Sequence, residues 1–351
     1  MGGWPELKCR RASVKNARRL CFRDKDVKMN TQNITIIGLG RTGTSIALAI
    51  KASSLEVSLI GHDGDPDLNK QALDLGAVDK IDSNLIRAVS VADILVLAIP
   101  AVDLEPTLQA IGGNLQGHTL VIDLTALKGP GLKFAERYLS KGHYIGARPI
   151  FSAASFSDGL TDMGSARADL FTNSVFCLMP GAKTDPQAVD TAVNFGRLLG
   201  ASPYFVDPLE YDSLAQGVES IPGLIAATIF SSVNKTTAWR DILRFADLPF
   251  ATATMPLEAG APELAYLALN DKLATLRWID ALMAEIKDLR RLVYEGNAEI
   301  LAALLDEMNN SRAQWLHERS ENSWIETKDS AAEIPGMSRR LLGSLSNLGN
   351  R

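Results

Sequence analysis

The chain has 351 residues, 46% of them hydrophobic, with three cysteines and a formal net charge of −5, and this length predicts two domains with enough apolar material for a core. The odd cysteine count without C-x-x-C spacing indicates neither a disulfide framework nor a metal site, and predicts a reducing, cytoplasmic setting. No apolar run approaches the roughly 18 residues of a membrane span, so no membrane partner is expected.

Positive charge is concentrated at the N-terminus. Residues 1–29 carry a net charge of +6, which leaves −11 for the rest of the chain. An acidic body argues against nucleic-acid binding. We interpret residues 1–32 as a basic, disordered extension without the apolar segment of a secretory signal. An Arg-rich targeting segment and a start codon assigned too early, with Met29 as the true start, remain alternatives.

Residues 34–51 predict a strand, a glycine turn and a helix. Gly38 permits the tight turn, Gly40 permits close approach to a pyrophosphate, and Gly43 permits close packing of helix on strand. A second strand over residues 56–61 leads to Asp63, 20 residues after Gly43. A carboxylate at this position can accept both ribose hydroxyls of an adenosine. The stretch therefore predicts a dinucleotide-binding site.

The residues around this turn favour NAD over NADP as the cofactor. Asp63 would repel a 2′-phosphate, and Gly64 follows it where an arginine could have received one. Arg41 lies in the glycine turn, where we expect it to meet the pyrophosphate. Further cofactor contacts are expected at Thr42, Pro100 and Thr125.

The chain from residue 34 to 206 alternates short apolar runs with helical segments, which is typical of an open, mostly parallel α/β sheet of the Rossmann type. We expect strands at 34–37, 56–61, 76–82, 92–100, 119–123, 143–146, 174–180 and 203–206, and helices at 66–75, at 104–111 and from about 128. Ligands collect at the carboxyl ends of such strands. The segments to inspect are therefore Pro100, 123–128 and 148–152.

The pattern becomes helical after Asp207. A helix over 211–235 contains Pro222, which predicts a kink or a break. A single long helix is expected over 261–295, ended by Gly296, and Asn297 is a plausible N-cap for a last helix that reaches Trp315. We expect a dinucleotide-binding domain over 33–206, an all-α domain over 207–325 and a flexible tail over 326–351.

The long helix carries a wide apolar stripe and has no sheet of its own to cover it. We expect a homodimer in which the C-terminal helices of two copies pack together. A self-contained helical bundle is the alternative. The stripe is formed by Leu269, Leu273, Leu276, Ile279, Met283, Ile286, Leu289 and Val293.

From about Asn33 to Trp315 the chain resembles the prephenate and arogenate dehydrogenase family, enzymes of tyrosine biosynthesis with a Rossmann domain followed by a helical dimerisation domain. The matching segments are GLGRTGTSIALAIK with the Gly61-His62-Asp63 turn, ADILVLAIP, DLTALKG, ARADLF, the IPG helix and Trp239-Arg240-Asp241 with Arg244. The resemblance implies hydride transfer to NAD with oxidative decarboxylation.

The sequence departs from this family where the chemistry is expected. The family's His-Pro pair after the sixth strand, whose histidine contacts the substrate hydroxyl, reads Arg148-Pro149 here. Guanidinium stays charged and cannot act as a base, but it binds carboxylates. Ser220 and Gly223 replace two family histidines, and Ala126 replaces a serine. The loop over 150–169 is also longer and lacks the family's A-G-[ST]-E.

The candidates for the chemistry are Lys128, Arg148 and Arg240. Lys128 follows the fifth strand, where a nicotinamide ring is expected, and could act as acid or base if burial and Arg148 lowered its pKa. A solvated lysine at a helix start is the alternative. The resemblance implies that Arg240 reaches a substrate carboxylate, with a surface arginine as the alternative. The four histidines (His62, His118, His143 and His317) are better explained as surface or loop residues.

Three functions remain open. The first is the family's own NAD-dependent reaction, which the missing histidine argues against. The second is a repurposed dehydrogenase or reductase that acts on another carboxylate-bearing substrate, with Arg148 as its anchor. The third is a catalytically inactive NAD-binding dimer, which the ribose-binding acid and Arg240 disfavour. In every case a small molecule is the expected partner.

Overall fold

The computed structural model describes residues 31–156 and 163–322, so residues 1–30 of the expected basic extension and the whole expected tail from 326 on lie outside the described residues. Eight strands form one sheet in the order β3-β2-β1-β4-β5-β6-β7-β8. All neighbours pair in parallel except β6 and β7, which are antiparallel. The strands are β1 (Asn33–Ile37), β2 (Ser58–His62), β3 (Lys80–Ile81), β4 (Ile94–Leu97), β5 (Leu120–Asp123), β6 (His143–Pro149), β7 (Ser174–Pro180) and β8 (Ala201–Phe205).

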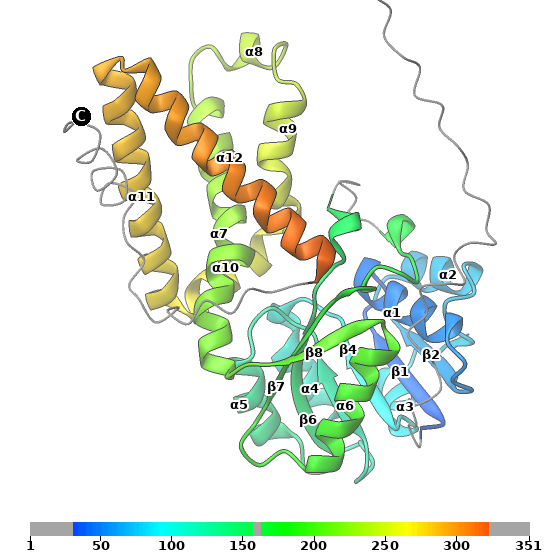
Figure 1. Ribbon diagram of the computed structural model, residues 1–351. Helices are drawn as coiled ribbons and strands as arrows, with labels where there is room; N and C mark the ends of the chain where they lie inside the picture. Colours follow the sequence, from blue (N-terminus) through cyan, green and yellow to red (C-terminus); the bar gives the residue numbers. More distant parts are fainter. Residues whose placement is uncertain (1–30, 157–162, 323–351) are drawn as a thin grey trace, which may run out of the picture.

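Helices cover both faces of this sheet (Figure 1). Successive residues of β4 point to opposite faces, so Ile94 and Val96 join one hydrophobic cluster while Leu95 and Leu97 join the other. The helices of this domain are α1 (Arg41–Ala52), α2 (Pro66–Asp74), α3 (Leu85–Ser90), α4 (Leu104–Ile111), α5 (Gly129–Tyr138) and α6 (Pro186–Leu198). The predicted Rossmann-type, mostly parallel sheet is confirmed.

The glycine turn between β1 and α1 has the close contacts that its sequence predicts. Gly38 has a φ of +90°, and a Cβ there would lie 2.3 Å from the carbonyl oxygen of Ala98. A Cβ on Gly43 would lie 1.9 Å from the carbonyl oxygen of Gly38. A Cβ on Gly40 would meet no atom within 4 Å. Two glycines are thus required by packing, and the third leaves space above the turn.

The helical part begins at Pro208, directly after the last strand. Its elements are α7 (Pro208–Asn234), α8 (Trp239–Ile242), α9 (Leu248–Thr254), the 3-10 helix η5 (Met255–Ala259), α10 (Ala261–Asn270), α11 (Lys272–Glu295) and α12 (Ala298–Glu321). They extend away from the sheet, as Figure 1 shows. Gly296 ends α11 in a left-handed conformation and Asn297 caps α12, as predicted.

The structure corrects two predictions about these helices. The expected single helix over 261–295 is divided at Asp271, because its carboxylate accepts a hydrogen bond from the Ala274 N–H and starts a new helix there. Of the kink or break expected at Pro222, the break is absent, since the 27-residue helix α7 runs through this proline. By length and composition α7 is the one described helix that could span a membrane, but here it packs against α10 and α11.

The last helix returns to the sheet (Figure 1). Near the end of α12, Arg319 donates a hydrogen bond of 2.7 Å to the Phe151 carbonyl. Asn173 donates one of 2.8 Å to the Ser320 carbonyl. The helical part is therefore attached to the sheet at both of its ends, through the start of α7 and through α12.

Candidate functional site

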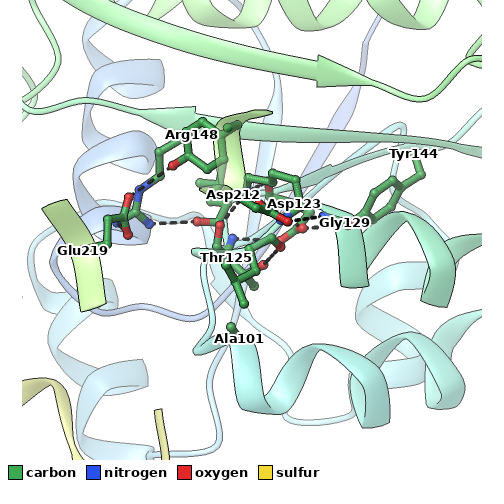
Figure 2. Close-up of polar contacts among 12 residues, drawn as sticks. Ala101, Asp123, Thr125, Gly129, Tyr144, Arg148, Asp212 and Glu219 are labelled. Atoms are coloured by element: carbon green, nitrogen blue, oxygen red, sulfur yellow. Dashed lines mark hydrogen bonds and ion pairs between the residues drawn. The ribbon is translucent and has the colours of Figure 1, made fainter. Parts of the chain in front are cut away.

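The carboxyl ends of β5 and β6 meet the first turns of α7, and the polar side chains of this junction form one connected cluster (Figure 2). Asp123 ends β5, Lys128 precedes α5 and Arg148 lies near the end of β6. Asp212 and Glu219 come from α7. The sequence predicted the strand ends as the place to inspect, and the helix supplies the remaining charged groups.

Lys128 is fully buried in this cluster. Its side chain has no solvent exposure, and Nζ donates to the carbonyl oxygens of Asp123, at 3.0 Å, and of Thr125. Nζ also lies 3.9 Å from the Asp123 carboxylate. Burial lowers the pKa of Lys128, the Asp123 charge opposes this shift, and the Arg148 charge adds to it. The alternative of a solvated lysine is wrong, and the ammonium holds the loop between β5 and α5.

Two carboxylates organise the same loop. Asp212 accepts hydrogen bonds from the backbone N–H groups of Lys128, at 2.6 Å, and Gly129, at 2.7 Å. It thereby caps α5 from another domain. Burial raises the pKa of Asp212, although the two N–H groups act in the opposite direction. Asp123 accepts a hydrogen bond of 2.6 Å from the Tyr144 hydroxyl, whose own pKa is raised well above its usual value by burial and by Asp123.

Arg148 pairs with a carboxylate that the sequence analysis did not identify. Its Nη2 donates to Glu219 Oε2 at 2.7 Å, and its Nη1 donates to the Leu124 carbonyl at 3.0 Å. The other oxygen of Glu219 accepts a hydrogen bond of 3.1 Å from the Tyr211 hydroxyl. Burial raises the pKa of Tyr211 well above its usual value, so this hydroxyl stays a donor. Figure 2 shows Arg148 and Glu219 pointing toward one another.

The predicted cofactor residues lie around the glycine turn and at the neighbouring strand ends. Asp63 follows β2, and its carboxylate accepts hydrogen bonds from the backbone N–H groups of Leu39, at 2.7 Å, and Asp65, at 2.8 Å. Arg41 and Thr42 begin α1, and the Arg41 guanidinium lies 5.2 Å from the centre of the Phe151 ring.

The loops after β4 and β5 are held by carboxylates. Pro100 follows β4, and the next two N–H groups, of Ala101 and Val102, donate to Glu263 of α10 at 3.0 and 3.1 Å. Thr125 is buried, and its N–H donates to Asp123 at 2.8 Å. The helical part therefore contacts both loops at which the cofactor residues were predicted.

Arg240 lies apart from this cluster within one chain. Its side chain is exposed on α8, which follows the end of α7 that lies away from the sheet (Figure 1). Arg148 contacts α7 at Glu219 instead. Arg148 and Arg240, each expected to contact a substrate carboxylate, are therefore not brought together in a single copy.

The histidines lie elsewhere. His118 and His143 line a cavity of about 430 Å³ near the start of β4 and β5, together with Asp93 and Asp185, at the amino ends of the strands. His62 Nδ1 lies 2.7 Å from the Asp82 carbonyl, and His317 is on α12. No group of metal-ligating side chains occurs within residues 31–156 and 163–322.

The sequence analysis missed Asp212, Glu219, Tyr211 and Glu263. Glu219 directly precedes the Ser220-Ile221-Pro222-Gly223 segment that was noted, but a carboxylate on a helix is ordinarily solvated. Its partner Arg148 is 71 residues away. A contact of this kind depends on the packing of the two domains, and a single sequence carries no signal for it.

The chain is similar to several known proteins. The family model of the prephenate dehydrogenase nucleotide-binding domain matches residues 46–204. A prephenate dehydrogenase of Bacillus subtilis is 29% identical over 280 residues, covering 78% of this chain and 74% of that protein. A cyclohexadienyl dehydrogenase of Zymomonas mobilis is 24% identical over 284 residues, covering 80% of this chain and 95% of that protein.

Solved structures share the fold. A prephenate dehydrogenase of A. aeolicus, in complex with hydroxyphenyl propionate and NAD⁺, superposes with a TM-score of 0.70 at 20% identity, covering 82% of this chain and 99% of that chain. The arogenate dehydrogenase of Synechocystis superposes with a TM-score of 0.60 at 22% identity, covering 81% of this chain and 100% of that chain. The family model and the curated relatives thus confirm the resemblance seen in the sequence, and the solved structures share the fold.

Proposed function

We propose, from the premise that this chain is a relative of the prephenate and arogenate dehydrogenases, that it is an NAD-dependent dehydrogenase of that type. The observation that carries the proposal is the junction of β5, β6 and α7, where a charged cluster lies at the same carboxyl edge of the sheet as the glycine turn after β1. In the reaction a hydride leaves the hydroxyl-bearing ring carbon, the bond to the ring carboxylate breaks, and carbon dioxide departs as the ring becomes aromatic.

NAD supplies the hydride acceptor when bound, and the residues present fit it. The turn is closely packed at Gly38 and Gly43, where no Cβ would fit, and it is open at Gly40. A cofactor can occupy this open space, which a Cβ at Gly40 would begin to fill. We propose that Asp63 receives the ribose hydroxyls, that Arg41 and Thr42 face the pyrophosphate, and that Pro100 and Thr125 border the nicotinamide side. Each oxygen of Asp63 accepts one described hydrogen bond, which leaves lone pairs for a ribose.

The substrate groups would be held by the exposed part of the cluster. We propose that Arg148 binds a carboxylate of the substrate, because a partly exposed guanidinium offers several parallel donors. Lys128 would act on the loop that it holds rather than on the substrate, since its described donors face backbone carbonyls. Proton transfer by Lys128 itself stays a prediction.

Arg240 is proposed to bind a substrate carboxylate as well. It makes no hydrogen bond or ion pair within the described part of the chain, whereas its neighbours Asp241 and Arg244 pair at 3.6 Å. A free guanidinium on a short helix is available to a ligand. The Arg240→Ala variant should therefore raise the KM for substrate, and an unchanged KM would refute this role.

A second candidate function is a dehydrogenase or reductase for another carboxylate-bearing substrate. The specific observation in its favour is Arg148 paired with Glu219, since neither side chain offers the neutral, titrating ring of a histidine. With either function, we propose a cytoplasmic enzyme whose partner is a small molecule rather than nucleic acid or a membrane.

We also propose that the protein is a homodimer joined through its C-terminal helices. Exposed large apolar side chains are gathered on α11, including Leu273, Met283, Ile286 and Val293. Soluble proteins rarely leave such a row uncovered. A second copy can cover it with the same surface.

The assay that tests the function follows NADH absorbance with prephenate and arogenate, each offered with NAD⁺ and NADP⁺, beside a direct titration of cofactor binding. We expect turnover with NAD⁺ and tighter binding of NAD⁺ than of NADP⁺. Tight NAD⁺ binding without turnover of either substrate would reject the first function and favour the second.

A further inference from the structure

Arg148 and Glu219 differ from the other charged side chains of the cluster in being accessible. Their side chains are 32% and 19% exposed. Those of Lys128 and Asp123 have no exposure, and Asp212 is only 5% exposed. A ligand that reaches this pair from solvent therefore meets one cation and one anion, side by side at 2.7 Å.

Both groups keep hydrogen-bonding capacity for a ligand. A guanidinium has five N–H donors, and the described bonds of Arg148 use only those to Glu219 and Leu124. A carboxylate has about four acceptor sites, and Glu219 uses one oxygen for Arg148 and the other for the Tyr211 hydroxyl. The Leu124 carbonyl and Tyr211 fix the two partners in place, so a ligand would find them already oriented.

We propose that the Arg148–Glu219 pair is a receptor for an α-amino acid group, and that it makes this protein select the amino-acid substrate over the corresponding keto acid. The carboxylate of such a group would lie on the free donors of Arg148, and its ammonium on the free lone pairs of Glu219. The inference rests on the proposed function, and it assigns Glu219 as a specificity-determining residue.

The charges decide between the two substrates. Arogenate carries an ammonium beside its side-chain carboxylate, whereas prephenate carries a keto group at that carbon. The amino acid brings its carboxylate to Arg148 and its ammonium to Glu219, so each member of the pair meets a group of opposite charge and forms charge-assisted hydrogen bonds. The keto acid brings only negative charge next to Glu219, and a carboxylate bound at Arg148 would then face a like charge.

The experiment compares kcat/KM for arogenate and for prephenate in the full-length enzyme with NAD⁺. Wild-type protein should prefer arogenate. Glu219→Gln keeps one acceptor oxygen for Arg148, and its NH₂ group can donate to the Tyr211 hydroxyl in place of the lost acceptor. The substitution removes the charge and should lower kcat/KM for arogenate by about ten- to hundredfold. The value for prephenate should stay the same or rise. If Glu219 had only a structural role, the substitution would lower kcat/KM for both substrates by a similar factor.

Glu210→Gln is the matched control, because Glu210 is exposed on the same helix and its side chain makes no described contact with the cluster. It should leave the substrate ratio unchanged. If Glu219→Gln unfolds at assay temperature, Glu219→Asp serves instead and should keep the preference for arogenate.

The outcomes separate the inference from the function on which it rests. A wild-type preference for prephenate, or a Glu219→Gln variant with an unchanged ratio, overturns the inference and leaves the function standing. No turnover of either substrate overturns the proposed function, and the inference falls with it.

Discussion

At the scale of single residues, Lys128 shows how burial changes a charged group. Its ammonium has no exposure and is held by two backbone carbonyls beside Asp123. An ammonium without solvent is costly unless hydrogen bonds and an opposite charge replace the lost hydration. Gly146 of β6 lies so close to this side chain that a Cβ added at Gly146 would be 2.9 Å from Lys128 Cδ. The loop between β5 and α5 is therefore built around this side chain.

The lowered pKa of Lys128 predicts a pH dependence of stability. In the window between the folded pKa and the unfolded value of 10.5, the unfolded chain holds the proton and the folded chain does not, so stability rises with pH. The free energy of unfolding is measured with urea at increasing pH for the wild type and for Lys128→Met. The value for the wild type should rise relative to that of the variant until the pH reaches about 10.5. A difference that stays flat or falls would contradict the shift.

At the scale of elements, the turn between β1 and α1 contains one glycine that packing requires and one that it does not. Gly43 lies against the Gly38 carbonyl, so a methyl group there must displace backbone. Gly40 has no neighbour within 4 Å and an ordinary φ of −67°. Packing within the element therefore requires a glycine at position 43, whereas it places no such demand on position 40.

Alanine substitutions at the two positions should therefore act differently. Gly43→Ala should destabilise the protein by about 1–3 kcal/mol, as overpacking does. Gly40→Ala should leave the unfolding midpoint unchanged and weaken NAD⁺ binding by roughly tenfold or more, about 1.4 kcal/mol. Thermal melts and a fluorescence titration of NAD⁺ measure the two effects. Equal NAD⁺ affinity in Gly40→Ala and wild type would contradict the role given to this turn.

The sheet could be predicted from the sequence and the division of the helices could not. Buried strands such as β4 and β7 are short apolar runs between polar segments, and this local pattern is readable. The apolar stripe, by contrast, continues from Leu269 to Leu273 across Asp271, where the helix ends. Whether a carboxylate there caps a new helix or lies in a longer one is decided by tertiary packing.

The same limit applies to the candidate site. Its half on the sheet follows from strand ends, which is how Lys128 and Arg148 were found. Its half on α7 depends on how the two domains meet, so Asp212 and Glu219 were missed although both lie in a correctly expected helix. Arg240 was placed by resemblance alone, and within one chain its helix lies apart from Arg148 (Figure 1).

At the scale of the whole molecule, the helical part leaves apolar surface that one copy does not cover. On α11, Leu273 is 82% exposed, Ile286 54% and Val293 62%. The opposite side of α11 already packs on α7, where Trp278 donates a hydrogen bond of 3.1 Å to the Ser213 carbonyl. These exposed side chains extend from the first turn of α11 to the last, which suits burial against an equivalent helix of a second copy rather than a small ligand.

A carboxylate placed in this row should separate the copies. Ile286→Glu would bury a charge in the proposed interface, where an unpaired ion is unfavourable by several kcal/mol. Light scattering after size-exclusion chromatography should then give the mass of one chain for the variant and of two chains for the wild type. Lys183→Glu is the control, because Lys183 is exposed in the loop between β7 and α6 of the sheet, outside α11, and this variant should stay dimeric. A monomeric wild type, or two variants with the same mass, would reject association through α11.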